Sequence, residues 1–510
     1  MEFSSKSLTF VPNLNEFLMN RQNLFAFVWM LMLAWLPVSA QGYRNPVIPG
    51  YHPDPSVCRV GDTFYLVNSS FQYFPGVPIF QSKDMVHWQQ IGNVLDRESQ
   101  IPLKGASSWL GIYAPTIRYH EGTYYMITTN VGNGGNFMVT ATDPRGPWSE
   151  PVWLKQQGID PSLYFENGKC YMVSNPGDAI WLCEINPKTG EQLTESKQLW
   201  QGDGGRYPEG PHIYKKDGYY YLLISEGGTE LAHRLTIARS RNIEGPYESN
   251  PNNPILTNCS RLGQSKQIQG TGHGDFVQAG DGSWWMIFLA YRNYGGSYHH
   301  LGRETYLAPV EWKEGEWPVV NGGMPIDTLV KTNTLPSIPL EKHLEADAED
   351  APTTGAFEWV QLQNPIPGNY LRNDTMAVDE KFFVRLYPHG SLTENQQPTF
   401  VGRRQESASF TLETEVSTKG DVEAGLSVYQ INDGHLDFFV SQKQVALRCK
   451  LKSIDYVVKS VPRLRKGSVK LRIRSNGEMY FFDYSLDGKQ FHELASMNCS
   501  LMSTEVAGGF

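Results

Sequence analysis

The chain has 510 residues, of which 40% are hydrophobic and 19% are charged, and its formal net charge at pH 7 is −9. This length allows two or three domains, and the acidic balance argues against a nucleic-acid-binding protein, which would present a basic face. The six cysteines are too few for a disulfide scaffold, and because they form no Cys-x-x-Cys pair they indicate no thiolate zinc site.

Residues 1–40 contain a pattern typical of a secretory signal. Arg21 precedes an apolar run from Leu24 to Leu36, and Val38-Ser39-Ala40 resembles a small-x-small cleavage site. The run is short for a transmembrane anchor, and Pro37 interrupts it near its end. No cysteine follows the run, so a lipoprotein anchor is not expected. We therefore predict a periplasmic or secreted protein with no membrane attachment after cleavage.

One sequence unit then occurs five times over residues 41–330. Each copy has a turn-forming tripeptide and a tight turn, usually with Gly, that leads into a strand of aromatic and aliphatic residues, which is a hairpin signal. The tripeptides are Asp54-Pro55-Ser56, Ala114-Pro115-Thr116, Asp160-Pro161-Ser162, Glu209-Gly210-Pro211 and His273-Gly274-Asp275. Their spacing of roughly 45–65 residues is typical of blades or solenoid units. The pattern predicts a five-bladed β-propeller.

Four of these blade starts carry side chains that are suited to chemistry. If the first strand of each hairpin is the innermost one, Asp54, Asp160, Glu209 and His273 converge at one pore mouth. In the fourth copy we expect Glu209 to precede a short strand, His212–Tyr214, followed by a turn at Asp217-Gly218 and a strand at Tyr219–Ile224. An Asp-Pro-Ser tripeptide alone is a common structural turn, but matched copies and a third carboxylate favour catalysis.

Three carboxylates at one pore match the needs of glycoside hydrolysis. That reaction uses a general acid for the leaving oxygen and a base or a nucleophile opposite it. A third carboxylate beside the acid raises the pKa of that acid by like-charge repulsion and keeps it protonated near neutral pH. The sequence pattern alone does not assign these roles to individual residues.

The remainder of the chain has a different pattern. Residues 331–350 are rich in Pro, Thr and acidic side chains, which predicts a linker. Apolar and polar residues alternate over 410–417 and 469–474, which is typical of half-buried antiparallel strands. We therefore expect a β-sandwich, a concanavalin-like jelly roll, over residues 351–510. Gly508-Gly509-Phe510 resembles the middle of a strand, so we expect a shortened sandwich or an incomplete sequence.

Several ordered motifs resemble glycoside hydrolase family 43, in particular members that join a five-bladed propeller to a C-terminal sandwich. The matching stretches are residues 45–56 with His52-Pro53-Asp54-Pro55-Ser56, Ser70-Phe71 with residues 74–79, Gly111-Ile112-Tyr113-Ala114-Pro115, Ile159-Asp160-Pro161-Ser162, Glu209-Gly210-Pro211-His212, Gly272-His273-Gly274-Asp275 and Leu301-Gly302-Arg303-Glu304-Thr305. The resemblance covers nearly the whole chain after residue 40. It implies an all-β fold with both of the predicted parts.

The resemblance also implies roles for individual residues. Asp54 would be the general base, Asp160 the residue that orients the general acid and modulates its pKa, and Glu209 that acid. The implied substrate-binding residues are Phe71, Tyr113, His273 and Arg303. Tyr113 stands where many relatives carry Trp, and core packing is the alternative for Phe71 and Tyr113. In some relatives the counterpart of His273 helps to hold a Ca²⁺ in the pore; the alternative is a buried histidine whose polar atoms are satisfied.

The function implied is an exo-acting, inverting hydrolase that releases terminal α-L-arabinofuranose or β-D-xylose from plant hemicellulose or its oligosaccharides, with arabinofuranose slightly favoured. No cofactor is expected to be required, since no nucleotide fingerprint or thiolate cluster is present. Two alternatives stay open. One is an endo-arabinanase or a related fructan hydrolase, and the other is a non-catalytic, lectin-type propeller that binds carbohydrate. The expected partner in each case is a carbohydrate, not nucleic acid.

Overall fold

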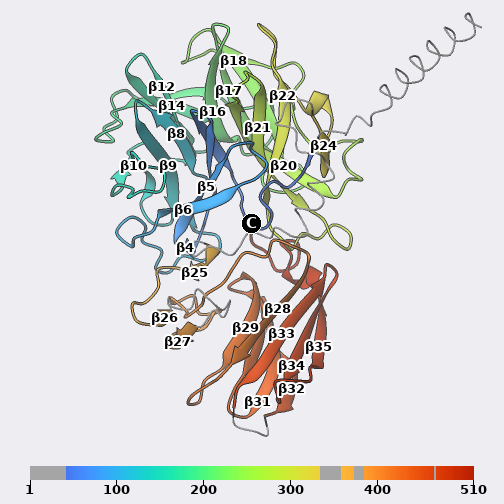
Figure 1. The fold of residues 1–510 in the computed structure, drawn as a ribbon. Coiled ribbons are helices and arrows are strands. Elements are labelled where there is room, and N and C mark those ends of the chain that lie inside the picture. Colours follow the sequence, from blue (N-terminus) through green and yellow to red (C-terminus); the bar gives the residue numbers. More distant parts are fainter. Residues whose placement is uncertain (1–41, 333–357, 373–383, 464–466) are drawn as a thin grey trace, which may run out of the picture.

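The computed structural model describes residues 42–332, 358–372, 384–463 and 467–510 (Figure 1). The predicted secretory signal lies outside these residues, as does the predicted linker from residue 333 onward. Apart from short 3-10 turns, the named elements are β-strands, which confirms the all-β prediction. None of the described residues belongs to a helix with the length and hydropathy that crossing a membrane requires.

Five antiparallel sheets form the propeller, one from each copy of the repeated unit. The first sheet contains β2 (Ser56–Val60), β3 (Thr63–Val67), β5 (Gly76–Ser82) and β6 (Gln89–Leu95), and the second contains β8 (Thr116–His120), β9 (Thr123–Val131), β10 (Gly135–Ala141) and β11 (Val152–Trp153), with β7 (Gly111–Ile112) added on β9. The third contains β12 (Ile159–Glu166), β13 (Lys169–Asn175), β14 (Ile180–Ile185) and β15 (Lys197–Trp200). The fourth contains β16 (Glu209–Lys216), β17 (Tyr219–Glu226), β18 (Arg234–Ser240) and β19 (Glu248–Ser249), and the fifth contains β20 (Ile268–Gln278), β21 (Trp284–Arg292), β22 (Glu304–Glu311) and β23 (Val319–Val320).

The first strands of the five sheets form a closed ring around the axis. Strand β2 contacts β8, β8 contacts β12, β12 contacts β16, β16 contacts β20, and β20 contacts β2 again. The ends of the propeller are joined by pairing of β1 (Gly42–Arg44) with β24 (Leu329–Lys331). An isolated bridge from Ile48 to Thr305 ties the N-terminal segment to the fifth sheet. The ring confirms the predicted five-bladed propeller and brings the start of each blade to one axis.

The hairpin turns explain why the repeats fold locally. Asp217 and Gly218 have φ of 52° and 74°, and Asn167 and Gly168 have φ of 51° and 75°. Two successive positive φ values match the right-handed twist of a two-residue hairpin, and Asn, Asp and Gly adopt them most readily. The strands that follow are largely buried in the hydrophobic clusters within and between blades.

The second part of the chain is a two-sheet sandwich. One sheet has the order β28 (Ser409–Val416), β33 (Val469–Asn476), β34 (Met479–Ser485), β35 (His492–Asn498), and the other has β29 (Ala424–Ile431), β30 (Gly434–Val440), β31 (Gln444–Leu451), β32 (Ile454–Pro462). The inner faces enclose one apolar cluster that includes Val469, Leu471 and Ile473, as their alternation predicted. This confirms the predicted sandwich. Smaller elements are β26 (Tyr370–Arg372), β27 (Val384–Leu386), η1 (Asn321–Gly323) and η3 (Cys499–Met502).

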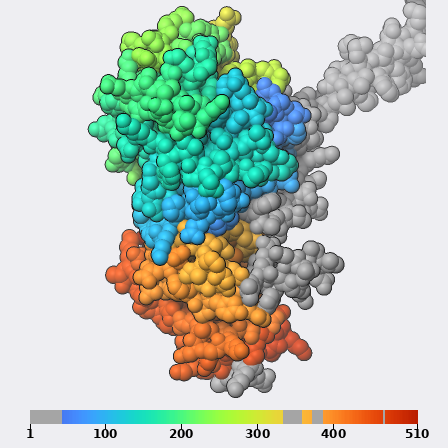
Figure 2. Space-filling view, turned by 90° about the vertical axis from the view of Figure 1, so that its left-hand side faces the viewer, coloured from blue at the N-terminus to red at the C-terminus, as the bar shows by residue number. Residues whose placement is uncertain are grey.

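Sandwich and propeller are in direct contact (Figure 2). Strand β25 (Gln361–Leu362) pairs with β4 (Tyr73–Phe74) of the first blade region, and Tyr429 Oη accepts a hydrogen bond of 3.1 Å from Gln72 Nε2. The chain end lies at this junction (Figure 1). The expectation of a strand at Gly508-Gly509-Phe510 was wrong: β35 ends at Asn498, and the segment after it turns away from the sheet toward the propeller.

Candidate active site

Two of the predicted carboxylates and His273 occupy the same unusual backbone position in their blades. Asp54, Asp160 and His273 have φ of 53°, 54° and 45°, a left-handed region that Asp and His tolerate better than most residues. In β12 and β20 the ladder with the next strand is interrupted around this position by a bulge. Bulges re-aim side chains, and here they direct the blade starts toward the axis.

Glu209 reaches the site from a position that is offset by one residue. Before the bulge, Glu209 pairs with Ser225 in the fourth blade in the same way as Ile159 pairs with Asn175 in the third. The next residue, Gly210, has φ of 59° and therefore corresponds to Asp160. Strand β16 therefore begins at Glu209, three residues earlier than the predicted His212. A Cβ at Gly210 would lie 3.1 Å from the His273 ring, so only glycine fits without displacement.

The predicted catalytic residues converge. Nδ1 of His273 lies 3.9 Å from Oδ1 of Asp54 and 3.9 Å from Oδ2 of Asp160. The backbone N–H of Gly210, next to Glu209, donates a hydrogen bond of 3.1 Å to Oδ2 of Asp160. Asp54, Asp160 and His273 are each at most 7% exposed. The ring of blades thus assembles one buried acidic site from residues more than two hundred positions apart.

The three carboxyl groups differ in acidity. Burial alone would raise the pKa of Asp54, but the charges of Arg303 and His273 and a hydrogen bond of 2.5 Å from Ser69 Oγ together lower it. Burial, with repulsion from Asp54, raises the pKa of Glu209 to about 7. Burial also raises the pKa of Asp160, and repulsion from Glu209 and Asp54 adds to the effect. Near neutral pH the site therefore combines an ionised Asp54 with a proton held on the Asp160 and Glu209 pair.

Arg303 forms the side of the site next to Asp54. Its Nη1 donates a hydrogen bond of 3.0 Å to Oδ1 of Asp54, and the residue is 3% exposed. Its Nε and Nη2 atoms are also buried and make no hydrogen bond of regular geometry within the described chain, although Tyr51 lies close enough to the guanidinium to contribute to its raised pKa. A buried donor without a partner costs about 1–3 kcal/mol. A ligand hydroxyl in this place would remove that cost.

An aromatic cluster of Phe71, Trp109, Tyr113 and Phe510 covers Arg303. The Phe71 ring lies 5.2 Å from that of Tyr113, and the Arg303 guanidinium lies 5.6 Å from the Phe71 ring and 5.5 Å from the Phe510 ring. Phe510 in turn lies 5.4 Å from Phe71, 4.7 Å from Trp109 and 5.8 Å from Tyr113. The structure therefore gathers all the predicted substrate-binding residues, Phe71, Tyr113, His273 and Arg303, around the carboxylates.

Sequence reasoning missed Phe510, Trp109 and Ser69. Ser69 directly precedes the Ser70-Phe71 motif, so the sequence offered a local reason to place it near the site. Phe510 has none, because it enters the site from the sandwich, 207 residues after Arg303 in the numbering. Its approach depends on how the two parts of the chain pack together.

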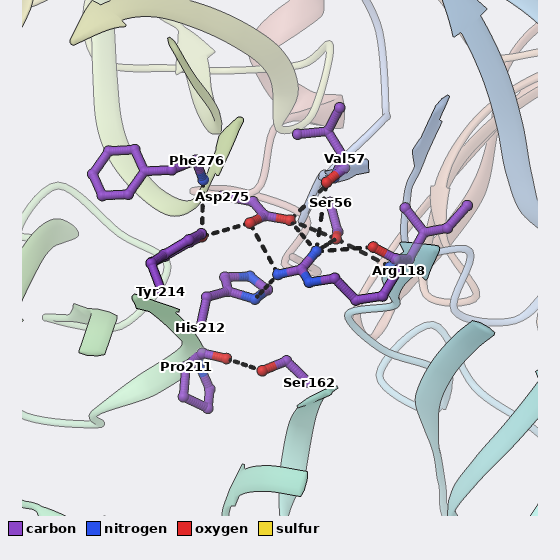
Figure 3. Close-up of polar contacts among 10 residues, drawn as sticks. Ser56, Val57, Arg118, Ser162, Pro211, His212, Tyr214, Asp275 and Phe276 are labelled. Carbon is purple, nitrogen blue, oxygen red and sulfur yellow. Dashed lines mark hydrogen bonds and ion pairs between the residues drawn. The ribbon is translucent and has the colours of Figure 1, made fainter. Parts of the chain in front are cut away.

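Behind the site, a polar hub joins four of the five blades (Figure 3). Asp275 is fully buried and accepts hydrogen bonds from Nη1 and Nη2 of Arg118 at 2.8 and 3.1 Å. It also accepts from Tyr214 Oη at 2.5 Å, from Ser56 Oγ at 2.7 Å and from the Val57 N–H at 3.1 Å. Ser56 begins β2 two residues after Asp54, and the hub therefore fixes the start of the strand that follows the predicted base.

The pore is built around an arginine cation. Arg118 Nη2 lies 3.0 Å from Nδ1 of His212, three residues after Glu209. No group of three or more His, Cys, Asp or Glu side chains suited to a metal ion occurs within the described residues. Ca²⁺ takes six to eight oxygen ligands in proteins, whereas the oxygens of Asp275 are already engaged by protein donors. Asp275 therefore offers no free oxygen to a Ca²⁺ ion, and we derive no step through a metal.

Comparison with known proteins places this geometry in a family. The family model described as glycosyl hydrolases family 43 matches residues 43–318, and that described as the beta xylosidase C-terminal concanavalin A-like domain matches residues 351–510. The chain is 39% identical to a non-reducing end alpha-L-arabinofuranosidase of Bacteroides ovatus, over 94% of this chain and 92% of that protein. It is 40% identical to a xylosidase/arabinosidase of Butyrivibrio fibrisolvens, over 92% and 93%. The crystal structure of a xylan beta-1,4-xylosidase from Bacillus halodurans is similar with a TM-score of 0.82 at 32% identity, covering 92% of this chain and 94% of that one.

Proposed function

The chain belongs to glycosyl hydrolase family 43, as its motifs predicted, and we propose that it releases terminal α-L-arabinofuranose or β-D-xylose from plant hemicellulose or its oligosaccharides. It is a glycoside hydrolase. Support for the two sugars comes from relatives named as an arabinofuranosidase and as a xylosidase/arabinosidase. The two sugars present similar hydroxyl arrangements, so one site can accept both; arabinofuranose is our first choice.

The observation that carries the proposal is the split in acidity among the three carboxyl groups beneath Arg303. A glycosidase needs one carboxylate and one protonated carboxyl in the same site. Asp54 has a lowered pKa and Glu209 a raised one, and the two come from blades one and four, which are not adjacent in the ring. A lectin-type propeller would gain nothing from burying like charges together, because their repulsion disfavours the folded state.

We assign the general base to Asp54. Its ionised carboxylate is held by Arg303 and Ser69, and it would take a proton from the water that attacks the anomeric carbon. Glu209 would give its proton to the leaving glycosidic oxygen. Asp160 would accept the Gly210 N–H, which favours its charged form and leaves the shared proton on Glu209.

We propose a single displacement with inversion of the anomeric carbon. Asp54 and Glu209 belong to blades one and four of the ring, so a sugar between them leaves room for a water on the Asp54 side. Inverting enzymes keep their two carboxyls roughly 6.5–9.5 Å apart for this purpose. In this mechanism Glu209 donates one proton, Asp54 accepts one, and no covalent intermediate forms.

The aromatic cluster supports an exo pocket for one terminal pentose. Phe71, Tyr113 and Phe510 would enclose the sugar ring, and the free N–H groups of Arg303 would bind its hydroxyls. An open cleft of the endo type would instead need a path for the polysaccharide on both sides of the scissile bond. We further propose that the enzyme acts in the periplasm or outside the cell, and that it requires no cofactor.

The test uses 4-nitrophenyl α-L-arabinofuranoside and β-D-xyloside together with arabinoxylan and debranched arabinan. We expect free pentose from the aryl glycosides and from the ends of the polymers, and proton NMR of the first-formed sugar should show the inverted anomer. A product with the anomeric configuration of the substrate would refute inversion. Release of long oligosaccharides without monosaccharide would favour the endo-arabinanase alternative, and binding without any hydrolysis would favour the lectin alternative.

A further inference from the structure

The C-terminal segment, residues 499–510, runs from the sandwich to the site. On leaving η3 it makes a compact turn, in which the N–H groups of Ala507 and Gly508 donate to the carbonyl oxygens of Ser503 and Thr504 at 2.9 and 3.1 Å. Gly508 and Gly509 then have φ of 98° and 97°, a conformation that favours glycine. These residues lead the chain to Phe510, which lies over Arg303.

A contact between Glu505 and His299 joins this segment to the propeller. Nδ1 of His299 donates to Oε1 of Glu505 at 2.6 Å, and the backbone N–H of His299 donates to Oε2 at 3.1 Å. The backbone N–H of Thr504 donates to the carbonyl oxygen of His299 at 3.3 Å. Three hydrogen bonds thus join two short segments that lie 206 residues apart in the chain.

His299 is held in a fixed orientation. It is 5% exposed, and its ring stacks on that of Tyr291 in β21 at 4.0 Å with an interplanar angle of 16°. It also belongs to the same segment as Arg303, between β21 and β22. One short piece of the propeller therefore carries both the arginine of the site and the partner that holds the segment bearing Phe510.

On the sandwich side the start of the segment is held by Cys499 and Met502, which are buried in the apolar core of the sandwich, whereas the polar contacts that the later residues make there are long. Ala507 packs against Gly434, where an added Cβ would lie 2.7 Å from that of Ala507. Gln430 Nε2 reaches Thr504 Oγ1 and the Gly508 carbonyl oxygen only at 3.4 Å. The charged contact with His299 is shorter than these, and hydrogen bonds to ionised groups are roughly twice as strong as neutral ones.

We propose that His299 is a positioning residue for substrate binding: by holding Glu505, it sets Phe510 over Arg303 and so shapes the wall of the pentose pocket. This inference rests on the proposed function for its substrate. In this view the sandwich contributes Phe510 to the site, and the position of Phe510 depends on His299 of the propeller. Because Phe510 touches the pocket and not the carboxylates, losing the contact should raise KM more than it lowers kcat.

The first experiment measures the segment directly, without activity. Hydrogen exchange of residues 499–510 is followed by mass spectrometry in the wild-type full chain, in His299→Ala and in Glu505→Gln. Glu505→Gln tests the contact from its half-exposed side and avoids a cavity beside Tyr291. The matched control is Glu423→Gln, which breaks an ion pair of 2.8 Å with Arg448 within the sandwich. We expect faster exchange of the segment in the first two variants and wild-type exchange in the control.

The second experiment is a double-mutant cycle on the aryl pentosides with His299→Ala, Phe510→Ala and the double variant. We expect His299→Ala to raise KM on the order of tenfold. A change of this size corresponds to the lower end of the free-energy range for a hydrogen bond to a charged group. When Phe510 has already been replaced by Ala, the His299→Ala substitution should change KM by less than about twofold, because the contact between His299 and Glu505 acts on the substrate only through Phe510. Rescue by His299→Gln, which restores a donor, should be partial.

The outcomes separate the two proposals. Equal effects of His299→Ala with and without Phe510 would overturn the positioning role and indicate general destabilisation. Unchanged KM, or unchanged exchange of residues 499–510 in both variants, would also overturn it. If the wild type released no pentose, the proposed function would fall, and Kd values for free arabinose and xylose in the same four proteins would decide the positioning role.

Discussion

The hub at Asp275 gives a prediction whose size follows from the structure. The substitution Asp275→Asn replaces a fully buried carboxylate that accepts from Arg118, Tyr214, Ser56 and the Val57 N–H. The new amide has one acceptor oxygen in place of two, and its NH₂ group would face donors. Arg118, whose side chain is 18% exposed, would keep an unbalanced charge.

Breaking a buried ion pair by removing one partner costs about 3–5 kcal/mol of unfolding free energy. For a domain of this size, each kcal/mol of lost unfolding free energy lowers Tm by about 2–4 °C. We therefore expect Asp275→Asn to lower the Tm of the propeller by about 10 °C at pH 7, measured by scanning calorimetry. The control is Glu150→Gln, which removes a surface ion pair with Arg97 whose side chains are 59% and 37% exposed. Such pairs contribute about 0–1 kcal/mol, so the control should shift Tm by no more than about 4 °C.

The pH dependence supplies an independent check. Burial would raise the pKa of Asp275, but the charge of Arg118 and the hydrogen bonds from Arg118 and Tyr214 lower it well below its ordinary value. A carboxyl whose pKa is lower in the folded than in the unfolded state stabilises the fold above the unfolded pKa, and the stabilisation is lost as the pH falls. The Tm difference between wild type and Asp275→Asn should thus be constant above about pH 5 and shrink below about pH 4. A variant within about 2 °C of wild type at pH 7 would refute this account of the hub.

Three further predictions concern the site. Glu209→Gln and Asp54→Asn should each lower kcat on arabino- and xylo-oligosaccharides by about 10²–10⁴-fold, and Glu209→Gln should recover partly on aryl glycosides with good leaving groups, which need little protonation; near-wild-type kcat in either variant would contradict the assignment. Asp160→Asn should move the basic limb of the pH–rate profile to lower pH, since it removes a negative neighbour from the coupled pair in which Glu209 has its raised pKa; an unchanged basic limb would argue against its role. Dialysis against a chelator should leave kcat/KM within about twofold, because Arg118 supplies the cation of the pore; a loss that added Ca²⁺ restores would overturn this.

The sequence by itself determined the strands and most of the candidate site. Turn pairs such as Asp217-Gly218 and the runs that flank them encode hairpins locally, since φ preferences and period-two alternation need no distant partner. Repetition of the unit then implied the ring, and a ring brings the first strands to one axis. For this reason Asp54, Asp160 and Glu209 could be grouped from sequence alone, although the predicted start of the first strand of the fourth blade at His212 was three residues late. A bulge is a matter of ladder register, which depends on the neighbouring strand.

Only the tertiary structure decided what covers the site and what sets its acidity. The sequence Gly508-Gly509-Phe510 looked like a strand, because local preferences do not show that Glu505 meets His299 and draws the segment toward the propeller. The opposite pKa shifts of Asp54 and Glu209 arise from burial and from Arg303, whose guanidinium comes from a different blade. Coulomb energies and burial depend on distances between atoms far apart in the chain, and those distances exist only once the ring has closed and the sandwich has packed against it.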